Sequence, residues 1–245
     1  MTTQMAAVIE GRMTSSRLPG KVMMKLGELP AFQHLVNRLR AVPEITQIIL
    51  ATTTNSTDNV LVSFAESLGV KTYRGSEDDV LGRITRATEN AKCEYVVKVT
   101  ADCPVIDPVI IQKVIKLSEQ VKVDFTSNTI VRSYPDGMDC GVISLKALQR
   151  AESLAEDPLE REHTSLYIRR HPSLFTTANL LAPPNLTWPD LGLTLDTIED
   201  LKFLNQIFHD LKSVDNFSCL DILELLESKP ELLEINAQVA RRGDT

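Results

Sequence analysis

Apolar residues in the first half of the chain form short unbroken runs, and stretches of helical periodicity separate these runs. Unbroken apolar runs of this length predict strands that are buried on both faces, as in a parallel sheet. The amphipathic stretches predict helices that cover the two faces, so the fold class is α/β with a mostly parallel sheet. The expected strands are 5–10, 45–54, 70–75, 94–104 and 123–128, and the expected helices are 31–42, 58–69, 78–91 and 108–120.

The pattern changes in the second half of the chain. Residues 129–145 alternate around a Pro-Asp-Gly turn, and two helix-like stretches follow. We expect residues from about 129 to 183 to be an insertion that leaves the sheet, and the chain to return in the apolar run before Asp196. The last part, about 217–245, has a helical pattern. Because no repeat or Gly/Ser-rich linker divides the chain, 1–245 is expected to be a single domain.

Composition narrows the function classes. The 245 residues carry a net charge of −7, with 43% hydrophobic and 24% charged residues, which is ordinary for a globular protein. This balance offers no general attraction for nucleic acid or acidic membranes, so neither is an expected partner and any anion site must be local. No apolar run approaches the roughly 18 residues of a membrane span, and the first residues lack the charged start of a secretion signal. The four cysteines form no CxxC pair, which favours reduced thiols and a cytoplasmic protein.

One stretch is locally basic. Residues 10–23, EGRMTSSRLPGKVM, follow the first expected strand and contain Arg12, Arg17 and Lys21. Parallel sheets bind ligands beyond the carboxyl ends of their strands, which is where these cations are expected. The stretch has neither the Walker A pattern nor the G-x-G-x-x-G pattern. Its serines, guanidinium forks, ammonium group and Gly20 nevertheless suit a polyphosphate, with a solvated basic turn as the alternative interpretation.

The string GRMTSSRLPGKVMMKLGELP resembles the nucleotide-binding opening of the bacterial cytidylyltransferases that activate sugar acids, A-R-x-x-S-x-R-L-P-G-K. This family includes the 3-deoxy-manno-octulosonate (KDO) and acylneuraminate cytidylyltransferases, and the resemblance is greatest to the spore coat polysaccharide SpsF-like subgroup. Further similar strings follow in the family's order over almost the whole chain: LATTTNSTDN, VKTYRGSEDDVLGRI, VKVTADCPVIDP, SYPDGMDCGVIS, EREHTSLYI and LTLDTIEDL.

The resemblance implies a Rossmann-like nucleotide-diphospho-sugar transferase fold that uses CTP and Mg²⁺. It implies transfer of CMP to a hydroxyl of an anionic sugar acid, with release of pyrophosphate. It also implies a homodimer, in which the segment of about 129–183 makes the subunit contact and helps cover the acceptor. The residues that match the family's site are Arg12 and Lys21 as catalytic cations; Gly11, Arg12, Ser15, Ser16, Arg17, Lys21, Arg74, Gly75 and Ser76 as nucleotide-binding residues; Asp102 and Asp196 as metal ligands; and Tyr134, Asp136, Asp139, Glu162 and His163 as acceptor-binding residues.

The two aspartates also stand out without the resemblance. Asp102 and Asp196 each follow an apolar run, so each is expected at the carboxyl end of a strand. Two converging carboxylates suit Mg²⁺, which completes its shell with water and phosphate oxygens. Each has a structural alternative, Asp102 as a turn residue before Pro104 and Asp196 as the N-cap of the next helix. In the same way, PDGMD can be only a tight turn and His163 a structural residue.

The chain departs from the family pattern at several positions. Gly11 stands where the family commonly has Ala, Ala101 replaces Gly in TGDCP, and Gly141 and Cys140 replace the Glu and Val that follow PDGxD. The cations and carboxylates remain, but the acceptor-side changes leave the sugar open.

Three alternatives therefore accompany the main interpretation. The first is CTP-dependent activation of a sugar or polyol phosphate. The second is a glycosyltransferase of the same fold type, which normally carries a D-x-D metal motif that TADCP lacks. The third is a catalytically idle homologue, which is expected to have lost Lys21, Asp102 or Asp196.

Overall fold

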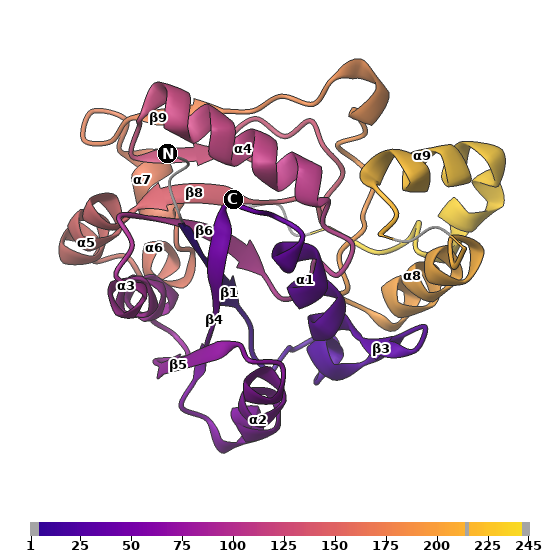
Figure 1. Ribbon diagram of the computed structural model, residues 1–245, viewed down its shortest axis with the longest axis horizontal. Coiled ribbons are helices and arrows are strands. Elements are labelled where there is room, and N and C mark those ends of the chain that lie inside the picture. The colour runs from indigo at the N-terminus through magenta and orange to yellow at the C-terminus, as the bar shows by residue number, and fades with distance from the viewer. Residues whose placement is uncertain (1–4, 214–215, 242–245) are drawn as a thin grey trace.

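A computed structural model describes residues 5–213 and 216–241 (Figure 1). In this part of the chain seven strands form one sheet in the order β5-β4-β1-β6-β8-β7-β9, and a separate hairpin joins β2 to β3. The strands are β1 (Met5–Glu10), β2 (Lys25–Leu26), β3 (Leu29–Pro30), β4 (Ile45–Thr53), β5 (Lys71–Gly75), β6 (Tyr95–Thr100), β7 (Phe125–Ser127), β8 (Gly141–Ser144) and β9 (Thr177–Asn179). The four strands β5, β4, β1 and β6 run parallel, which confirms the predicted α/β fold class.

Both faces of this sheet are buried. Along β1, Met5, Ala7 and Ile9 belong to one apolar core, and Ala6 and Val8 belong to another on the opposite face. A strand that is covered on both sides needs an unbroken apolar run, which is why the sequence pattern identified it. The first core is closed by α1 (Ala31–Arg40), α2 (Asn59–Ser67) and α4 (Pro108–Val121), and the second by α3 (Val80–Ala91), α5 (Leu145–Leu154) and α7 (Leu166–Arg170).

Local signals set the helix ends in this half. Gly69 adopts a left-handed conformation, φ 71°, and closes α2 as expected. Asp79 caps α3 by accepting a hydrogen bond from Gly82 N at 2.9 Å. The expected strand over 94–104 is shorter than predicted, because β6 ends at Thr100 and the chain turns before Pro104.

The expectation that residues 129–183 leave the sheet is wrong for two strands. β8 lies inside the sheet, antiparallel to both β6 and β7, and β9 pairs with β7 at the edge. The stretch expected to be helical after residue 157 is two short helices, α6 (Pro158–Glu162) and α7. The four residues of β8 gave too short a pattern to be recognised as a central strand.

The apolar run before Asp196 is extended but is not a strand. Leu191, Leu193 and Leu195 are buried as their alternation predicts, yet their backbone pairs with loops. Leu193 N donates to Asp136 O at 2.7 Å, and Leu195 N donates to Asp102 O at 2.8 Å. The prediction of a strand that ends at Asp196 is therefore wrong, although the run still crosses to the end of β6.

A third apolar cluster lies beside the sheet, where α8 (Ile198–Asp210) and α9 (Cys219–Ser228) pack together (Figure 1). The tail expected to be helical over 217–245 is helical only in part. α9 ends at Ser228, ahead of Pro230, a 3₁₀ turn covers Pro230–Ile235, and residues 236–241 are irregular. The last four positions of that expected tail lie outside the described residues. None of the described helices is long and apolar enough to cross a membrane.

Candidate active site

A cavity of about 710 Å³ lies at the carboxyl ends of the parallel strands. Glu10, the last residue of β1, is in register with Ala51 of β4 and Thr100 of β6, so these strands end at the same edge. The walls come from the opening stretch, the β5–α3 connection, the residues after β6, and α6 with its flanks. The predicted site residues that line it are Gly11, Arg12, Ser15, Ser16, Arg17, Lys21, Ser76, Asp102, Glu162, His163 and Asp196.

The opening stretch is held as a compact loop. Gly20 has a φ of 74° and donates from its backbone N to Met13 O at 2.8 Å, a left-handed turn that favours glycine. Asp58 is fully buried and accepts hydrogen bonds from Met13 N at 2.7 Å and from Thr52 Oγ1 at 2.8 Å. Burial alone would raise the pKa of Asp58, but the donors from Thr53, Met13 and Thr52 outweigh it and lower the pKa. This buried carboxylate, which was not predicted, ties the loop to the end of β4.

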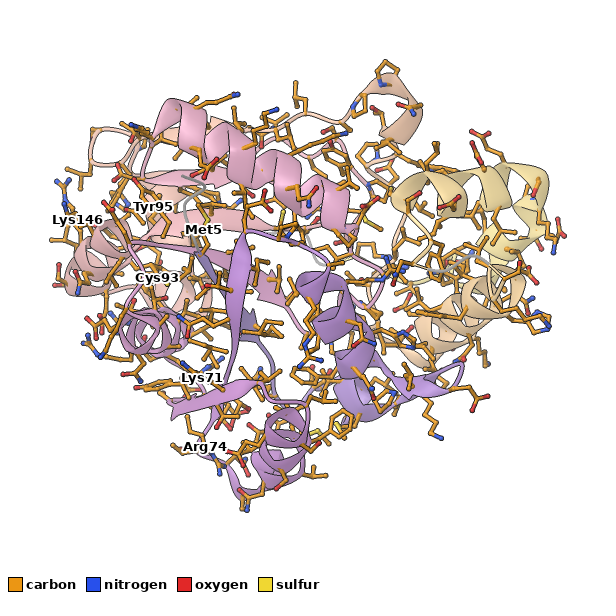
Figure 2. All side chains as sticks on the ribbon, viewed as in Figure 1. Met5, Lys71, Arg74, Cys93, Tyr95 and Lys146 are labelled. Atoms are coloured by element: carbon orange, nitrogen blue, oxygen red, sulfur yellow. The ribbon has the colours of Figure 1, made fainter. Side chains whose placement is uncertain are left out.

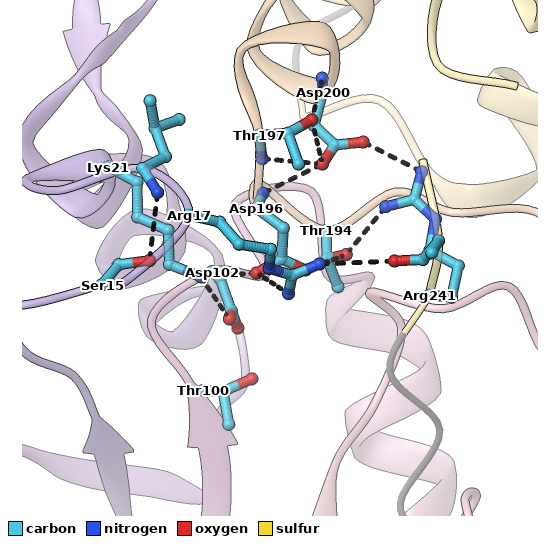
Figure 3. A network of polar contacts seen from close by, with 12 residues as sticks. Ser15, Arg17, Lys21, Thr100, Asp102, Thr194, Asp196, Thr197, Asp200 and Arg241 are labelled. Atoms are coloured by element: carbon cyan, nitrogen blue, oxygen red, sulfur yellow. Dashed lines mark hydrogen bonds and ion pairs between the residues drawn. The ribbon is translucent and has the colours of Figure 1, made fainter. Parts of the chain in front are cut away.

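Lys21 joins the two predicted metal carboxylates (Figure 3). Its Nζ lies 2.7 Å from Asp102 Oδ2 and 2.8 Å from Asp196 Oδ1. Burial would lower the pKa of Lys21, but the charges of Asp102 and Asp196 outweigh it and raise the pKa. Burial would raise the pKa of Asp102, but the charge and hydrogen bond of Lys21 together with the hydrogen bond of Thr100 outweigh it and lower the pKa. Arg17 contributes a second cation, 2.8 Å from Asp196 Oδ1.

The local setting of Asp196 decides between its two interpretations. The N-cap of α8 is Thr197, which forms a capping box with Asp200, so the N-cap interpretation of Asp196 is wrong. Instead Asp196 presents its carboxylate to the cavity and accepts a hydrogen bond from Thr194 Oγ1 at 3.0 Å through Oδ2. Asp102, two residues past β6, faces it across Lys21.

The two carboxylates fit a shared, partly hydrated cation. Both already converge on one positive group, the ammonium of Lys21. Among the described residues, no group of three or more His, Cys, Asp or Glu side chains forms a complete metal cage. Two converging carboxylates suit a Mg²⁺ ion, which takes its remaining oxygens from water and a phosphate substrate.

Arg12 occupies the side of the cavity next to the β5–α3 connection. Its Nη1 lies 2.8 Å from Glu77 Oε1, which also accepts a 2.6 Å hydrogen bond from Thr14 Oγ1. Arg83 is 3% exposed and donates to the backbone carbonyls of Ser76 and Glu77. Burial lowers the pKa of Arg83. Glu77 and Arg83 were not predicted as site residues, although both lie in the string VKTYRGSEDDVLGRI, because their role depends on packing across the cavity.

Two predicted nucleotide residues lie elsewhere. Arg74 lies at β5, close to α2 (Figure 2), and donates to Thr53 O at 2.8 Å and Asn55 O at 2.7 Å. Its guanidinium is therefore used to join β4, β5 and the start of α2. Gly75 is next to it, and a Cβ there would lie 3.0 Å from Arg83 Cγ. Ser76 is the member of this group that reaches the cavity.

The predicted acceptor residues fall into two groups. Glu162 and His163 line the cavity at the end of α6, whereas Tyr134, Asp136 and Asp139 do not. Tyr134 is 1% exposed within the third apolar cluster. Asp136 and Asp139 both face Arg132, at 3.5 Å and 2.8 Å. Burial and the charge of Asp139 raise the pKa of Asp136 to about 6.

Departures from the family pattern have packing consequences. A Cβ on Gly11 would lie 2.7 Å from Ala101 Cβ, so the glycine and the alanine at these two positions fit each other. At Gly141 a Cβ would lie 2.6 Å from Phe125 Cε2, so the ring of Phe125 fills the space of a side chain there.

Comparison with known proteins gives a consistent result. The model of the cytidylyltransferase family matches residues 6–231. An uncharacterised protein of Methanocaldococcus jannaschii is 32% identical, with 96% of each chain covered. The spore coat polysaccharide biosynthesis protein SpsF of Bacillus subtilis is 30% identical, over 91% of this chain and 94% of SpsF. The solved structure of a cytidylyltransferase from Leptospira borgpetersenii superposes with a TM-score of 0.89 at 27% identity, covering 98% of this chain and all of that one (100%). The chain therefore belongs to the cytidylyltransferase family, a family of nucleotidyltransferase enzymes.

Proposed function

We propose that the protein transfers CMP from CTP to a hydroxyl of a sugar acid, with release of pyrophosphate, for the synthesis of a surface polysaccharide or glycan. The observation that carries the proposal is the convergence of Lys21, Asp102 and Asp196 in a cavity that Arg12 and Arg17 also line. Three cations beside two carboxylates match the charges of a nucleoside triphosphate and its metal ion. The name of the relative SpsF, spore coat polysaccharide biosynthesis protein, supports the biological setting.

Each group of residues in the cavity has a separate role in this transfer. A sugar hydroxyl attacks the α-phosphorus and releases its proton to water. The bond from the α-phosphorus to the oxygen of the β-phosphate breaks as the new P–O bond forms, so pyrophosphate leaves with the electron pair. Lys21 stays protonated because its pKa is raised, so it can stabilise the negative charge on the departing pyrophosphate. Arg12 and Arg17 hold the triphosphate in line. When bound, Mg²⁺ held by Asp102 and Asp196 neutralises phosphate charge.

We assign the base to the side of Ser76 and the β5–α3 connection, on the resemblance of this segment to the family's cytidine pocket. A small pocket distinguishes cytosine from uracil through the polarity of its hydrogen bonds, because N4 of cytosine donates where O4 of uracil accepts. Such polarity rejects a mismatched base more strongly than shape does. CTP is therefore the expected nucleotide.

The acceptor is assigned to the wall that α6 forms, where Glu162 and His163 end this helix. Arg161 lies in the same wall and could meet an anionic group, although its Nη2 already pairs with Asp79 at 2.5 Å. The acceptor class, an ulosonic or nonulosonic acid, rests on the family resemblance. A sugar or polyol phosphate is the competing acceptor.

A pyrophosphate-release screen tests the function directly. The four nucleoside triphosphates are paired with a panel of ulosonic acids, sugar phosphates and polyol phosphates, with and without Mg²⁺. We expect turnover only with CTP, Mg²⁺ and a sugar acid. Equal turnover of UTP would refute the nucleotide assignment, turnover of a phosphate acceptor alone would refute the acceptor class, and full activity in EDTA would refute the metal.

We further propose a cytoplasmic homodimer that uses the region of about 129–183. Val131 is 58% exposed and Leu181 is 59% exposed, and the segments that carry them are joined because Val131 N donates to Asn179 Oδ1 at 3.0 Å. Closed two-fold pairing is the commonest oligomer. Light scattering at micromolar concentration should give twice 27.3 kDa, and a monomer mass would reject the dimer.

A further inference from the structure

Residues 236–241 cross the outer side of the carboxylate site, beyond the 6–231 region that the family model matches. We propose that Arg241 in this segment is a positioning residue that fixes Asp196 for the metal–nucleotide complex. The proposal rests on the function proposed above, since it concerns the same site.

Arg241 reaches two residues that both touch Asp196 (Figure 3). Its Nη2 lies 2.9 Å from Asp200 Oδ1, and its Nη1 donates to Thr194 Oγ1 at 3.4 Å. Asp200 Oδ2 accepts hydrogen bonds from the backbone N of Asp196 at 3.1 Å and from the backbone N of Thr197 at 2.9 Å. Thr194 Oγ1 donates to Asp196 Oδ2 at 3.0 Å. Arg241 is thus linked to the backbone of Asp196 through Asp200 and to the side chain of Asp196 through Thr194.

Charge makes Arg241 the critical partner of Asp200. The side chain of Asp200 is 0% exposed, and Arg241 is the cation that pairs with it in the described part of the chain. Its other donors are neutral, such as Asn236 Nδ2 at 3.0 Å. Removal of one partner leaves an uncompensated buried charge, which favours rearrangement of the side chain that carries it. A displaced Asp200 would no longer accept both backbone N–H groups at Asp196 and Thr197 in the same way.

Gly192 provides the space that Arg241 occupies. A Cβ at Gly192 would lie 2.0 Å from Arg241 Cζ and 2.1 Å from its Nε. The Gly192 carbonyl also accepts from Arg241 Nη2 at 3.5 Å. Any side chain at this position must displace the guanidinium, so Gly192→Ala removes the contact while the arginine itself is retained.

The same segment also meets the cationic side of the site. Arg17, which pairs with Asp196 at 2.8 Å, donates from Nη1 to Ala240 O at 3.4 Å. The C-terminal segment therefore contacts both Thr194 and Asp200, which hold Asp196, and the arginine that is proposed to hold phosphate. Such outer partners orient ligands, and their mutation typically lowers metal affinity about 10–100-fold.

The test compares the full chain with Arg241→Ala, Arg241→Lys and Gly192→Ala. Arg86→Ala is the matched control, because Arg86 also pairs with carboxylates, Glu89 and Glu152 at 2.9 Å each, but does not line the cavity. Calorimetry measures CTP affinity over a series of Mg²⁺ concentrations. Hydrogen exchange measures the protection of the Asp196 and Thr197 amides without nucleotide.

For Arg241→Ala we expect the Mg²⁺ concentration of half-maximal effect to rise about 10–100-fold and the two amides to exchange faster. Gly192→Ala should shift both readouts in the same direction, Arg241→Lys should shift them less, and Arg86→Ala should shift neither. Wild-type Mg²⁺ dependence in Arg241→Ala and Gly192→Ala would overturn the proposal, even if the melting temperature fell. A wild-type protein that binds no CTP would instead refute the proposed function. The exchange measurement then still decides whether Arg241 fixes Asp196, and unchanged protection would overturn the positioning role.

Discussion

The two carboxylates of the site reach the same ammonium from regions of different construction. Asp102 follows β6, which is paired on one side with β1 and on the other with β8. Asp196 follows a run without regular pairing, and its position depends on Thr194 and Asp200. One carboxylate is thus placed by a sheet, and the other by a small set of polar side chains.

This difference has energetic consequences. Many backbone hydrogen bonds and apolar contacts hold β6, the strand before Asp102, so the position of Asp102 does not depend on any single distant side chain. The position of Asp196 depends on a few charged and hydroxyl groups, which a single substitution can remove. We therefore expect the stability of the region around Asp102, which the sheet holds, to respond to changes of side-chain volume. The region around Asp196, which polar side chains hold, should respond to changes of charge and pH.

The largest effect is expected where the two regions meet. Asp102→Asn and Asp196→Asn should each lower Mg²⁺-dependent turnover by roughly 10³, because metal stabilisation of the transferring phosphate amounts to several kcal/mol. The double variant should be hardly slower than either single one, since each change already empties a shared site. Turnover of the three variants measures this, with thermal melts as the control for folding. Additive losses would show that the two regions hold separate sites.

Replacement of the cation between them should have the next largest effect. Lys21→Ala removes the group that pairs with Asp102 at 2.7 Å and Asp196 at 2.8 Å. Loss of a donor to the leaving group typically lowers the rate about 10²–10³-fold, so kcat should fall by this amount while the KM of the sugar changes little. Steady-state kinetics at saturating CTP measure both constants. Near wild-type turnover would mean that the ammonium has only a structural role between the carboxylates.

The sequence predicted the sheet-held region well for a physical reason. Strands that are buried on both faces must be apolar throughout, and β1 coincides with its predicted range, Met5–Glu10. The second half lacks this constraint. β8 has only four residues, and the leucines before Asp196 are buried against loops, so an apolar pattern alone could not identify their partners.

The residues of the candidate site also fall into two groups, those that the sequence predicted and those that it did not. Lys21, Asp102 and Asp196 were predicted because their motifs stand in the family's order, and the structure brings them within hydrogen-bond distance. Asp58 and Arg241 were missed, because the role of each depends on a partner that is distant in the chain. Asp58 bonds Met13, 45 residues away, and Arg241 bonds Asp200, 41 residues away. The sequence therefore predicts the groups that line the cavity better than the groups that hold them.

Packing next to Asp102 can be tested at Gly11 and Ala101. Gly11→Ala places a Cβ 2.7 Å from Ala101 Cβ, and such overpacking typically destabilises a core by about 1–3 kcal/mol. Adding Ala101→Gly should recover most of this loss, because it restores the opposite arrangement of alanine and glycine found in the family pattern. Urea unfolding of the two single variants and the double variant gives the coupling free energy. Purely additive values would contradict a direct contact between the two positions.

The smallest effect on stability is expected from the charge of Asp136, whose backbone pairs with the run before Asp196 and whose side chain is 21% exposed. Burial and the charge of Asp139 raise its pKa to about 6, so the folded protein holds this proton more tightly than the unfolded chain does. Asp136 therefore destabilises the fold increasingly as the pH rises from about 4 through 6. Asp136→Asn should have nearly wild-type stability at pH 4 and a free energy of unfolding up to about 2 kcal/mol higher at pH 8.

Asp139→Asn is the matched control. It should lower the free energy of unfolding, because Asp139 accepts hydrogen bonds from Arg132 at 3.0 Å and 2.8 Å. Urea titrations from pH 4 to 8 measure these differences, and a gain for Asp136→Asn that does not change with pH would show that the effect comes from packing, as on the side of the sheet.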